Sequence, residues 1–373
     1  MAMEKSKNSE LSRREFLKEA CFIVGAATLG GTALMSGCGG GGEGKTTTPA
    51  TGSLTGTGSA DNDPVITYKV THQWAVDDVR DRLMRTFCSM VTQRTGGSVQ
   101  FLYYPNQALF KARETWDALR NGSCDMAVLP LDYASGKVTE LSITLLPCMV
   151  QSIEQGLSWK DKPIGAEVDK LLMEYGVRHV IWAWCDGAPG GKKVQIKVPE
   201  DVKGSKMRAA GRKVEYMFEK AGATINSMPS AEIYSSMATG VLDAALTSCA
   251  SWVTFRLYEQ VKYINVPRDN CMWFMEEGLL MSDKRYAKMT ENQKRIFDEC
   301  AKEVQDTWVL DNFKRDTQDV IRLFGEAKVE MYYMTKADYD IWNKFAQETS
   351  WKEFENTNAK CKQLLQLAQE ARI

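Results

Sequence analysis

The chain has 373 residues, more than one compact domain usually holds, which predicts two lobes. Its 47 Lys and Arg residues nearly balance its 48 Asp and Glu residues, and a net charge of −1 excludes the basic surface that nucleic-acid binding requires. The mean hydropathy is −0.34 and no apolar run reaches the ~20 residues of a bilayer span, which excludes a membrane channel.

Residues 1–37 read as a signal peptide for export. The string from Ser12 to Lys18 contains the pair Arg13-Arg14 before Glu15-Phe16-Leu17, which matches the twin-arginine export signal. Residues 21–35 are apolar but too short to cross a bilayer, as in the apolar region of a signal peptide. The alternative is a basic pair that precedes this apolar stretch by chance.

The segment that follows is predicted to anchor the protein to a membrane. Met35-Ser36-Gly37-Cys38 resembles a lipoprotein cleavage site, at which Cys38 would be lipidated and become the mature N-terminus. Residues 38–64 are rich in Gly, Thr and Ser and predict a flexible tether. The alternative is ordinary cleavage, which would release a soluble periplasmic protein.

Strands and helices alternate from residue 65 onward. We expect a strand at 66–70, a helix at 77–94, a strand at 99–104, a helix at 113–120, a strand at 125–129 and a further strand at 177–184. This alternation predicts an α/β sandwich of mostly parallel sheets. His179, in the last of these strands, is interpreted as a core histidine rather than a ligand. The chain has only one other histidine, His72, so no histidine-rich metal site is expected.

Two segments of the chain share one pattern. Residues 114–127 and 232–245 align without gaps, with identities at Glu114 and Glu232, Gly122 and Gly240, Asp125 and Asp243, and Ala127 and Ala245. Each copy predicts a helix, a glycine that ends it, and a strand that opens with Asp. The repeat favours two lobes with the same helix-to-strand corner, and ligands of such folds bind in the cleft between the lobes.

A long helix is expected between residues 290 and 327, where the sequence has no Pro and a single Gly. We favour a continuous or kinked helix that crosses both lobes; the alternative is two helices broken near residues 310–312.

Eight cysteines follow the tether: Cys88, Cys124, Cys148, Cys185, Cys249, Cys271, Cys300 and Cys361. An even number in an exported chain suits disulfides, but the spacings are wide and no C-x-x-C pair occurs. Buried thiols that act as small hydrophobic groups are the favoured interpretation. Free thiols also agree with twin-arginine export, which carries proteins folded in the reducing cytosol.

No catalytic motif is present, since H-E-x-x-H, G-x-S-x-G and a Gly-Lys-Ser/Thr phosphate loop are all absent. Arg208, at the end of the strand-like run Val202–Arg208, is the most suggestive polar residue. A guanidinium that faces an open cleft from a strand end binds a carboxylate through two parallel hydrogen bonds. The alternative is a surface arginine paired with an acid.

From about residue 65 to the end, the chain resembles the DctP-like solute-binding proteins of TRAP (tripartite ATP-independent periplasmic) transporters. The resemblance is carried by Tyr104–Phe110, Trp116–Ala127, Leu145–Pro147, Val202–Arg208, Pro229–Tyr234 and Gly240–Asp243. It implies an α/β, two-lobed fold of the periplasmic-binding-protein type (type II-like), with a ligand cleft between the lobes and a long helix across both. It also implies that Arg208 binds the substrate carboxylate.

The resemblance gives further expectations for the two lobes and the site. Lobe 1 would comprise residues 65–185, completed by about 305–373, and lobe 2 residues 186–304. Besides Arg208, the expected substrate-binding residues are His72, Gln73, Trp184, Thr247, Ser248, Trp252 and Trp273, with core packing as the alternative for each tryptophan. The chain has Asp186–Gly190 where many members have a second arginine, and Leu246-Thr247-Ser248 where some bridge a metal. We therefore expect no metal, no cofactor and a monocarboxylate ligand.

These features predict a periplasmic, lipid-tethered binding protein, not an enzyme, that carries a small organic acid to the small and large membrane subunits of a TRAP transporter. The alternative is a sensor that reports an organic acid to a membrane receptor or kinase. An exported hydrolase is the least favoured class, because the chain lacks a recognisable nucleophile.

Overall fold

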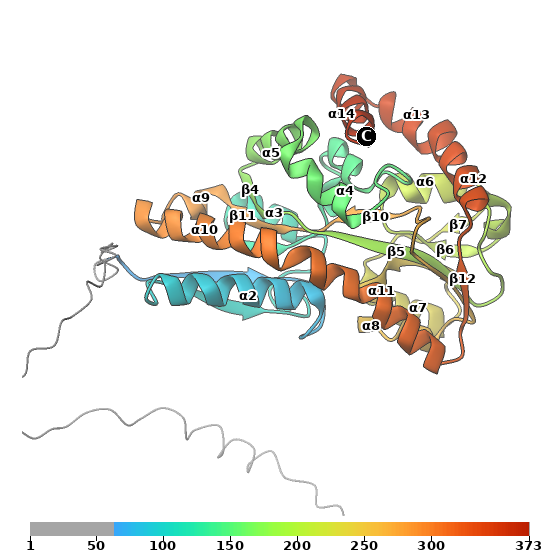
Figure 1. The fold of residues 1–373 in the computed structure, drawn as a ribbon, viewed down its shortest axis with the longest axis horizontal. Coiled ribbons are helices and arrows are strands. Elements are labelled where there is room, and N and C mark those ends of the chain that lie inside the picture. The colour runs from blue at the N-terminus through green and yellow to red at the C-terminus, as the bar shows by residue number, and fades with distance from the viewer. Residues whose placement is uncertain (1–62, 373) are drawn as a thin grey trace, which may run out of the picture. The chain divides into compact units, whose positions relative to one another are not determined.

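The computed structural model describes residues 63–372, and their strands form two sheets (Figure 1). The predicted export signal with Arg13 and Arg14, the lipidation site Cys38 and nearly all of the tether lie outside the described residues. The first sheet has the order β2 (Val99–Tyr104), β1 (Ile66–Thr71), β3 (Met126–Val128), β11 (Leu279–Ser282) and β4 (Val177–Ile181). The second has the order β12 (Glu330–Tyr333), β9 (Tyr263–Val266), β5 (Trp184–Gly191), β8 (Ala244–Ser248), β6 (Lys206–Arg208) and β7 (Thr224–Ile225), with β10 (Phe274–Glu276) paired to β5.

Helices pack around both sheets, as the alternation in the sequence predicts. They are α2 (Val79–Arg94), α3 (Thr115–Asn121), α4 (Ile153–Ser158), α5 (Pro163–Glu174), α6 (Arg212–Lys220), α7 (Ile233–Ala238), α8 (Cys249–Thr254), α9 (Asp283–Tyr286), α10 (Glu291–Thr307), α11 (Val309–Glu326), α12 (Lys336–Ala346), α13 (Lys352–Glu355) and α14 (Ala359–Glu370). The expected strands and helices of residues 66–129 are confirmed, with ends that differ by a few residues. Among residues 63–372, no helix combines the length and apolar character of a bilayer span.

The repeated segments form the same corner in each sheet. Gly122 after α3 and Gly240 after α7 both have a positive φ, which glycine adopts without steric cost. The next strand begins beside an aspartate whose Oδ2 accepts a backbone hydrogen bond from the neighbouring parallel strand: Asp125 from Lys69 N at 2.7 Å, and Asp243 from Lys206 N at 3.1 Å. The corner predicted from the sequence is therefore confirmed in both sheets.

The sheets are mixed, so the expectation of mostly parallel sheets is wrong. Strand pairs at the two corners are parallel, β1 with β2 and β3, and β6 with β7 and β8. The chain, however, crosses between the sheets twice, from β4 to β5 and from β10 to β11, and the pairs made by β5 and β11 are antiparallel. The expected single strand 177–184 is accordingly two strands, because the chain leaves the first sheet after Ile181 and enters the second at Trp184.

The long helical stretch consists of α10 and α11, which run end to end (Figure 1). The break is at Trp308, where φ is −114° and ψ is −41°, rather than near residues 310–312. The i→i−4 backbone bonds from Trp308 N to Val304 O and from Asn312 N to Trp308 O are kept, so the stretch is kinked, as favoured. Because α10 packs against α2 beside the first sheet and α11 against α8 beside the second, the pair spans both sheets. The residue boundaries of the two lobes stay predictions.

A buried cation, Arg80 on α2, connects the two sheets. Its guanidinium is paired with Asp78 (Nε to Oδ1, 2.7 Å) and with Glu277 (Nη1 to Oε1, 3.0 Å), which lies where the chain crosses from β10 to β11. It also donates to the hydroxyls of Ser248 and Ser251 at the start of α8, at 3.2 and 3.3 Å. Since no part of Arg80 reaches solvent, these partners replace its hydration.

His179 is a core histidine, as expected, and it lies between two acidic side chains. Its side chain is 2% exposed and lies between Asp169 on α5 and Glu276 on β10, at 3.1 and 3.0 Å. Burial alone would lower the pKa of His179, but the charge of Glu276 and hydrogen bonds to both acids raise it to about 9. The raised pKa favours the protonated imidazole, which bonds both Asp169 on α5 and Glu276 on β10.

All eight cysteines that follow the tether are free and buried. Burial raises the pKa of each thiol. The interpretation of these residues as buried hydrophobic thiols is confirmed.

Candidate functional site

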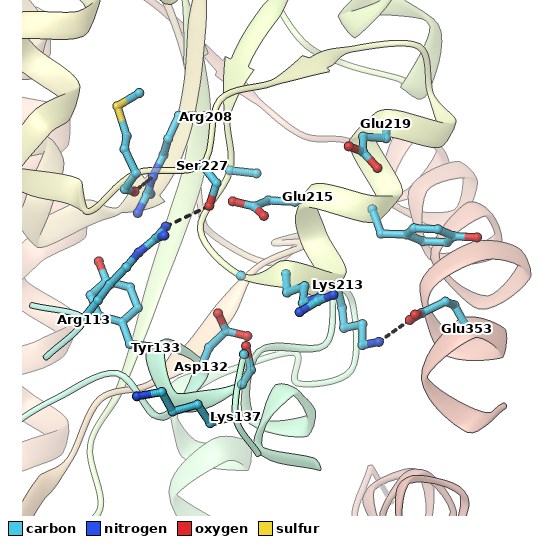
Figure 2. A pocket seen from close by; sticks show the side chains of 17 residues that line it. Arg113, Asp132, Tyr133, Lys137, Arg208, Lys213, Glu215, Glu219, Ser227 and Glu353 are labelled. Atoms are coloured by element: carbon cyan, nitrogen blue, oxygen red, sulfur yellow. Dashed lines mark hydrogen bonds and ion pairs between the residues drawn. The ribbon is translucent and has the colours of Figure 1, made fainter. Parts of the chain in front are cut away.

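A cavity of about 650 Å³ lies between the carboxyl end of β3 in the first sheet and the carboxyl end of β6 in the second (Figure 2). Asp132 and Tyr133 come from the 3₁₀ helix Leu131–Ala134 that follows β3, and Arg113 comes from the turn before α3. Arg208 is the last residue of β6, and Glu215 lies on α6. The other lining residues are Ser135, Gly136, Lys137, Ala209, Gly211, Arg212, Lys213, Tyr216, Glu219, Ser227, Met228 and Glu353.

Arg208 is a buried arginine without an acidic partner among the described residues. Its Nε donates to the backbone oxygen of Met228 at 3.1 Å and its Nη1 to that of Leu246 at 2.8 Å. Two neutral carbonyls fix the direction of the guanidinium but do not neutralise it. Burial lowers the pKa of Arg208, yet a guanidinium stays protonated in proteins. The sequence placed this residue in an open cleft; the structure instead leaves it 2% exposed.

Acidic side chains also line the cavity, and burial raises the pKa of two of them, Asp132 and Glu215. Burial, followed by the charge of Glu215, raises the pKa of Asp132 to about 7. Burial likewise raises the pKa of Glu215, against hydrogen bonding by Ser227 and the charges of Arg208 and Arg113. The cavity is therefore lined by charges of both signs, and among its lining residues only Lys213 and Glu353 form an ion pair with each other.

Side chains from the two sheets meet across this cavity. Arg113 Nη2, beside the first sheet, donates to the hydroxyl of Ser227 at 2.8 Å, as Figure 2 shows. The Tyr133 hydroxyl accepts from Gln73 Nε2 at 3.3 Å and from the backbone N–H of Ser230 at 3.4 Å. These contacts close the cavity on one side, and Arg113, like Arg208, has no ion-pair partner within residues 63–372.

Of the eight substrate-binding residues expected from the sequence, only Arg208 lines this cavity. Gln73 reaches its wall through Tyr133. His72, one residue earlier, is turned away: its Nε2 bonds Asp81 Oδ1 at 3.0 Å and its Nδ1 accepts from Trp74 N at 3.2 Å. Both residues follow β1. Thr71 in β1 pairs with Ala127 as Arg208 in β6 pairs with Ala245, so Thr71 occupies the position in the first sheet that Arg208 has in the second.

The three expected tryptophans are buried. Trp273 packs under the cavity wall and donates from Nε1 to Ala210 O at 3.0 Å. Trp184 packs edge-on against Trp159, and Trp252 donates to Ala188 O at 2.9 Å. Their surroundings are those of the core-packing alternative, and contact with a ligand stays a prediction for all three.

The two expected hydroxyl residues end β8. Ser248 caps α8 by accepting from the N–H of Ser251 at 3.2 Å, and it also accepts from Arg80. Thr247 is buried beside it, and its backbone oxygen lies against Gly187, where a Cβ atom would come within 2.4 Å. Neither lines the cavity, so their role in binding stays a prediction.

Apart from Arg208, sequence reasoning missed every residue of the cavity, including the charged residues Asp132, Glu215 and Arg113. One signal could have found Asp132: it follows the carboxyl end of a parallel strand, where ligands of open α/β sheets bind. Glu215 and Arg113 give no such signal, because charged residues on a helix and in a turn are ordinarily solvated. In the part of the chain that the structure describes, no three His, Cys, Asp or Glu side chains converge into a metal-binding group.

Comparisons with known proteins agree with this architecture. Residues 70–357 match the family described as "Bacterial extracellular solute-binding protein, family 7" (DctP). A solute-binding protein of Albidiferax ferrireducens is 36% identical over 307 residues, which cover 81% of this chain and 90% of that protein.

Two crystal structures extend the comparison. A TRAP periplasmic solute binding protein from Rhodoferax ferrireducens with bound malonate has a TM-score of 0.79 and 36% identity, covering 82% of this chain and 98% of that one. A TRAP protein from Sulfitobacter sp. NAS-14.1 with bound β-D-galacturonate has a TM-score of 0.75 over 82% of this chain and all of the other, at 22% identity, and supports the fold alone.

Extended strands that cross between two α/β sheets, with a buried unpaired arginine between them, define a two-lobed solute-binding protein. This chain belongs to extracellular solute-binding family 7, the DctP family of TRAP transporters. Family membership confirms the resemblance, the two-lobed fold and the expectation of an extracytoplasmic transport protein that is not an enzyme.

Proposed function

We propose that this protein binds a small organic acid in the cavity beside Arg208 and delivers it to the membrane subunits of a TRAP transporter. The observation that carries the proposal is the buried guanidinium of Arg208, which faces a 650 Å³ cavity without an ion-pair partner among the described residues. A charge buried without a partner is costly, so an arginine held in this way favours a bound anion. A ligand carboxylate would complete its hydrogen bonds.

The ligand class follows from the cavity and from the relatives. The relative at 36% identity has bound malonate, a small dicarboxylate. The sequence favoured a monocarboxylate on the basis of one cation among aromatic residues. The cavity instead contains a second unpaired arginine, Arg113, and no tryptophan. We therefore propose a small organic acid with one or two carboxylates, and the preference for a monocarboxylate stays a prediction.

A thermal-shift screen over small mono- and dicarboxylic acids tests this function. A ligand that binds only the folded protein at about 100 times its Kd stabilises it by about 2.7 kcal/mol, so the cognate acid is expected to raise the melting temperature. The matched controls are the neutral amides of the same acids, which should have no effect. If no acid raises the melting temperature more than its amide does, the proposal is wrong.

We also propose that Arg13 and Arg14 direct export and that lipidated Cys38 anchors the protein to the outer face of the cytoplasmic membrane. The Cys38→Ala variant should then move from the membrane fraction to the soluble periplasmic fraction or accumulate unprocessed. Cys21→Ala, in the predicted apolar region of the signal, is the matched control and should stay membrane-bound. Equal membrane association of Cys38→Ala and the unchanged protein would contradict the anchor.

A further inference from the structure

Asp132 has one carboxylate oxygen without a partner inside the cavity. The backbone N–H of Arg212 and the hydroxyl of Ser135 hydrogen-bond the carboxyl group, but its Oδ1 has no partner in the described structure. The residue is only 7% exposed, so water does not freely replace that partner. In Figure 2 the carboxyl group points into the cavity, toward the side that carries Arg208 and Glu215. A buried acceptor without a hydrogen-bond donor is unfavourable, so this oxygen requires a donor from another molecule.

A bare carboxylate cannot supply that donor. The ligand carboxylate proposed above would bind Arg208, and the same cavity places the negative charges of Asp132 and Glu215 on its other walls. An anion with no other polar group would find cations in Arg208 and Arg113, but it would leave Asp132 Oδ1 without a donor. A molecule with both a carboxylate and a nearby donor would satisfy Arg208 and Asp132 together.

We propose that Asp132 determines specificity by accepting a hydrogen bond, through Oδ1, from a hydroxyl or N–H group that the ligand carries beside the carboxylate bound by Arg208. The ligand class is therefore a hydroxy, amino or sugar acid rather than an unsubstituted acid. This inference rests on the proposed function and narrows it. Burial and the charge of Glu215 oppose the ionisation of Asp132, whereas the backbone N–H of Arg212, the Ser135 hydroxyl and the charge of Arg208 favour its ionised, accepting form.

The test compares acids that share one skeleton and differ in a single group. Succinate, L-malate and L-aspartate carry hydrogen, hydroxyl and ammonium at the same carbon, as do propionate, L-lactate and L-alanine. Calorimetric titration at pH 8 keeps Asp132 mostly ionised, since its pKa is about 7. In the unchanged protein, the better of the two substituted acids should bind about ten- to a hundredfold more tightly than the unsubstituted acid of its set, as expected for a hydrogen bond to a charged group.

Asp132→Leu removes the acceptor and the charge and keeps a side chain that branches at Cγ. The substituted acid should lose this advantage, while the unsubstituted acid should bind equally or more tightly because the repulsion is gone. Asp132→Asn, which retains hydrogen-bonding capacity toward Arg212 and Ser135, should change the affinities in the same direction by a smaller amount. This variant tests the inference if Asp132→Leu does not fold. Asp340→Asn, at an exposed position on α12, is the matched control and should keep the preference.

Loss of affinity for the substituted acid, without loss of affinity for the unsubstituted acid, distinguishes recognition by Asp132 from a structural role. Loss of a structural role would weaken the binding of both acids. The inference is wrong if the unchanged protein binds acids without preferring those that carry a donor. It is also wrong if both Asp132→Leu and Asp132→Asn weaken the binding of the unsubstituted acid, because that result would mean that Asp132 is protonated and donates a hydrogen bond to the ligand. Failure of every acid to bind the unchanged protein would overturn this inference together with the proposed function.

Discussion

Replacement of Arg208 by Ala is expected to weaken binding of the cognate organic acid by about thirty- to several-thousand-fold. The variant would leave a buried carboxylate without its charged partner, and truncation of one side of such a pair costs about 2–5 kcal/mol. Arg208→Lys should also bind much more weakly, because lysine keeps the charge but lacks the planar fork that bonds both carboxylate oxygens. Calorimetric titration of the acid identified by thermal shift measures both effects.

The folded state of the Arg208 variants needs its own control. Since Arg208 donates to the backbone oxygens of Met228 and Leu246, its removal leaves two buried acceptors unpaired and should lower stability by about 1–3 kcal/mol for each acceptor that water does not reach. Circular dichroism at the titration temperature therefore has to establish that the variants are folded. Arg322→Ala, at an exposed site on α11, is the matched arginine control. Unchanged affinity in folded Arg208→Ala would remove the carboxylate-binding role.

Arg80→Ala is expected to lower the free energy of unfolding by about 3–5 kcal/mol. The substitution leaves the carboxylates of Asp78 and Glu277 buried without their cation, and removal of one member of a buried ion pair has this effect. It also removes the donors that bond Ser248 and Ser251, so these two hydrogen bonds to the start of α8 are lost. Denaturant unfolding, followed by circular dichroism, gives the difference in free energy.

Arg82→Ala, two residues along the same helix, is the matched control for Arg80. Arg82 is exposed, and its removal should change the free energy of unfolding by no more than about 0.5 kcal/mol. Equal stability of the Arg80→Ala and Arg82→Ala variants would mean that water reaches Asp78 and Glu277 and that the buried ion pairs contribute nothing.

The parts of the fold that the sequence predicted correctly depend on local patterns. The corners at Gly122 and Gly240 were predictable because a positive φ selects glycine, and because Asp125 and Asp243 cap the neighbouring strand in the same way. Arg208 was predictable from its place at the end of a strand and from the family motif around it. In both cases the determining residues lie within one short segment of the chain.

The rest of the site depends on contacts between distant segments. Arg80 reads as an ordinary charged residue in an amphipathic helix, and only the fold brings Ser248 and Glu277 around it. In the same way, burial and the charge of Glu215, which lies on α6, together raise the pKa of Asp132. Packing between segments some eighty to two hundred residues apart determines which charged residues become buried and which groups surround them, and no local pattern in the sequence shows this.

The reaction rates of the eight buried thiols can report local opening of the folded protein. Alkylating reagents react with the thiolate, and burial both shields these sulfurs and raises the pKa of each thiol, so labelling at neutral pH requires that the surrounding structure open first. The thiols are spread over both sheets and the C-terminal helices, with Cys88 on α2, Cys249 on α8 and Cys361 on α14. Labelling rates measured residue by residue, with and without bound acid, would therefore map which regions a ligand protects without any engineered probe.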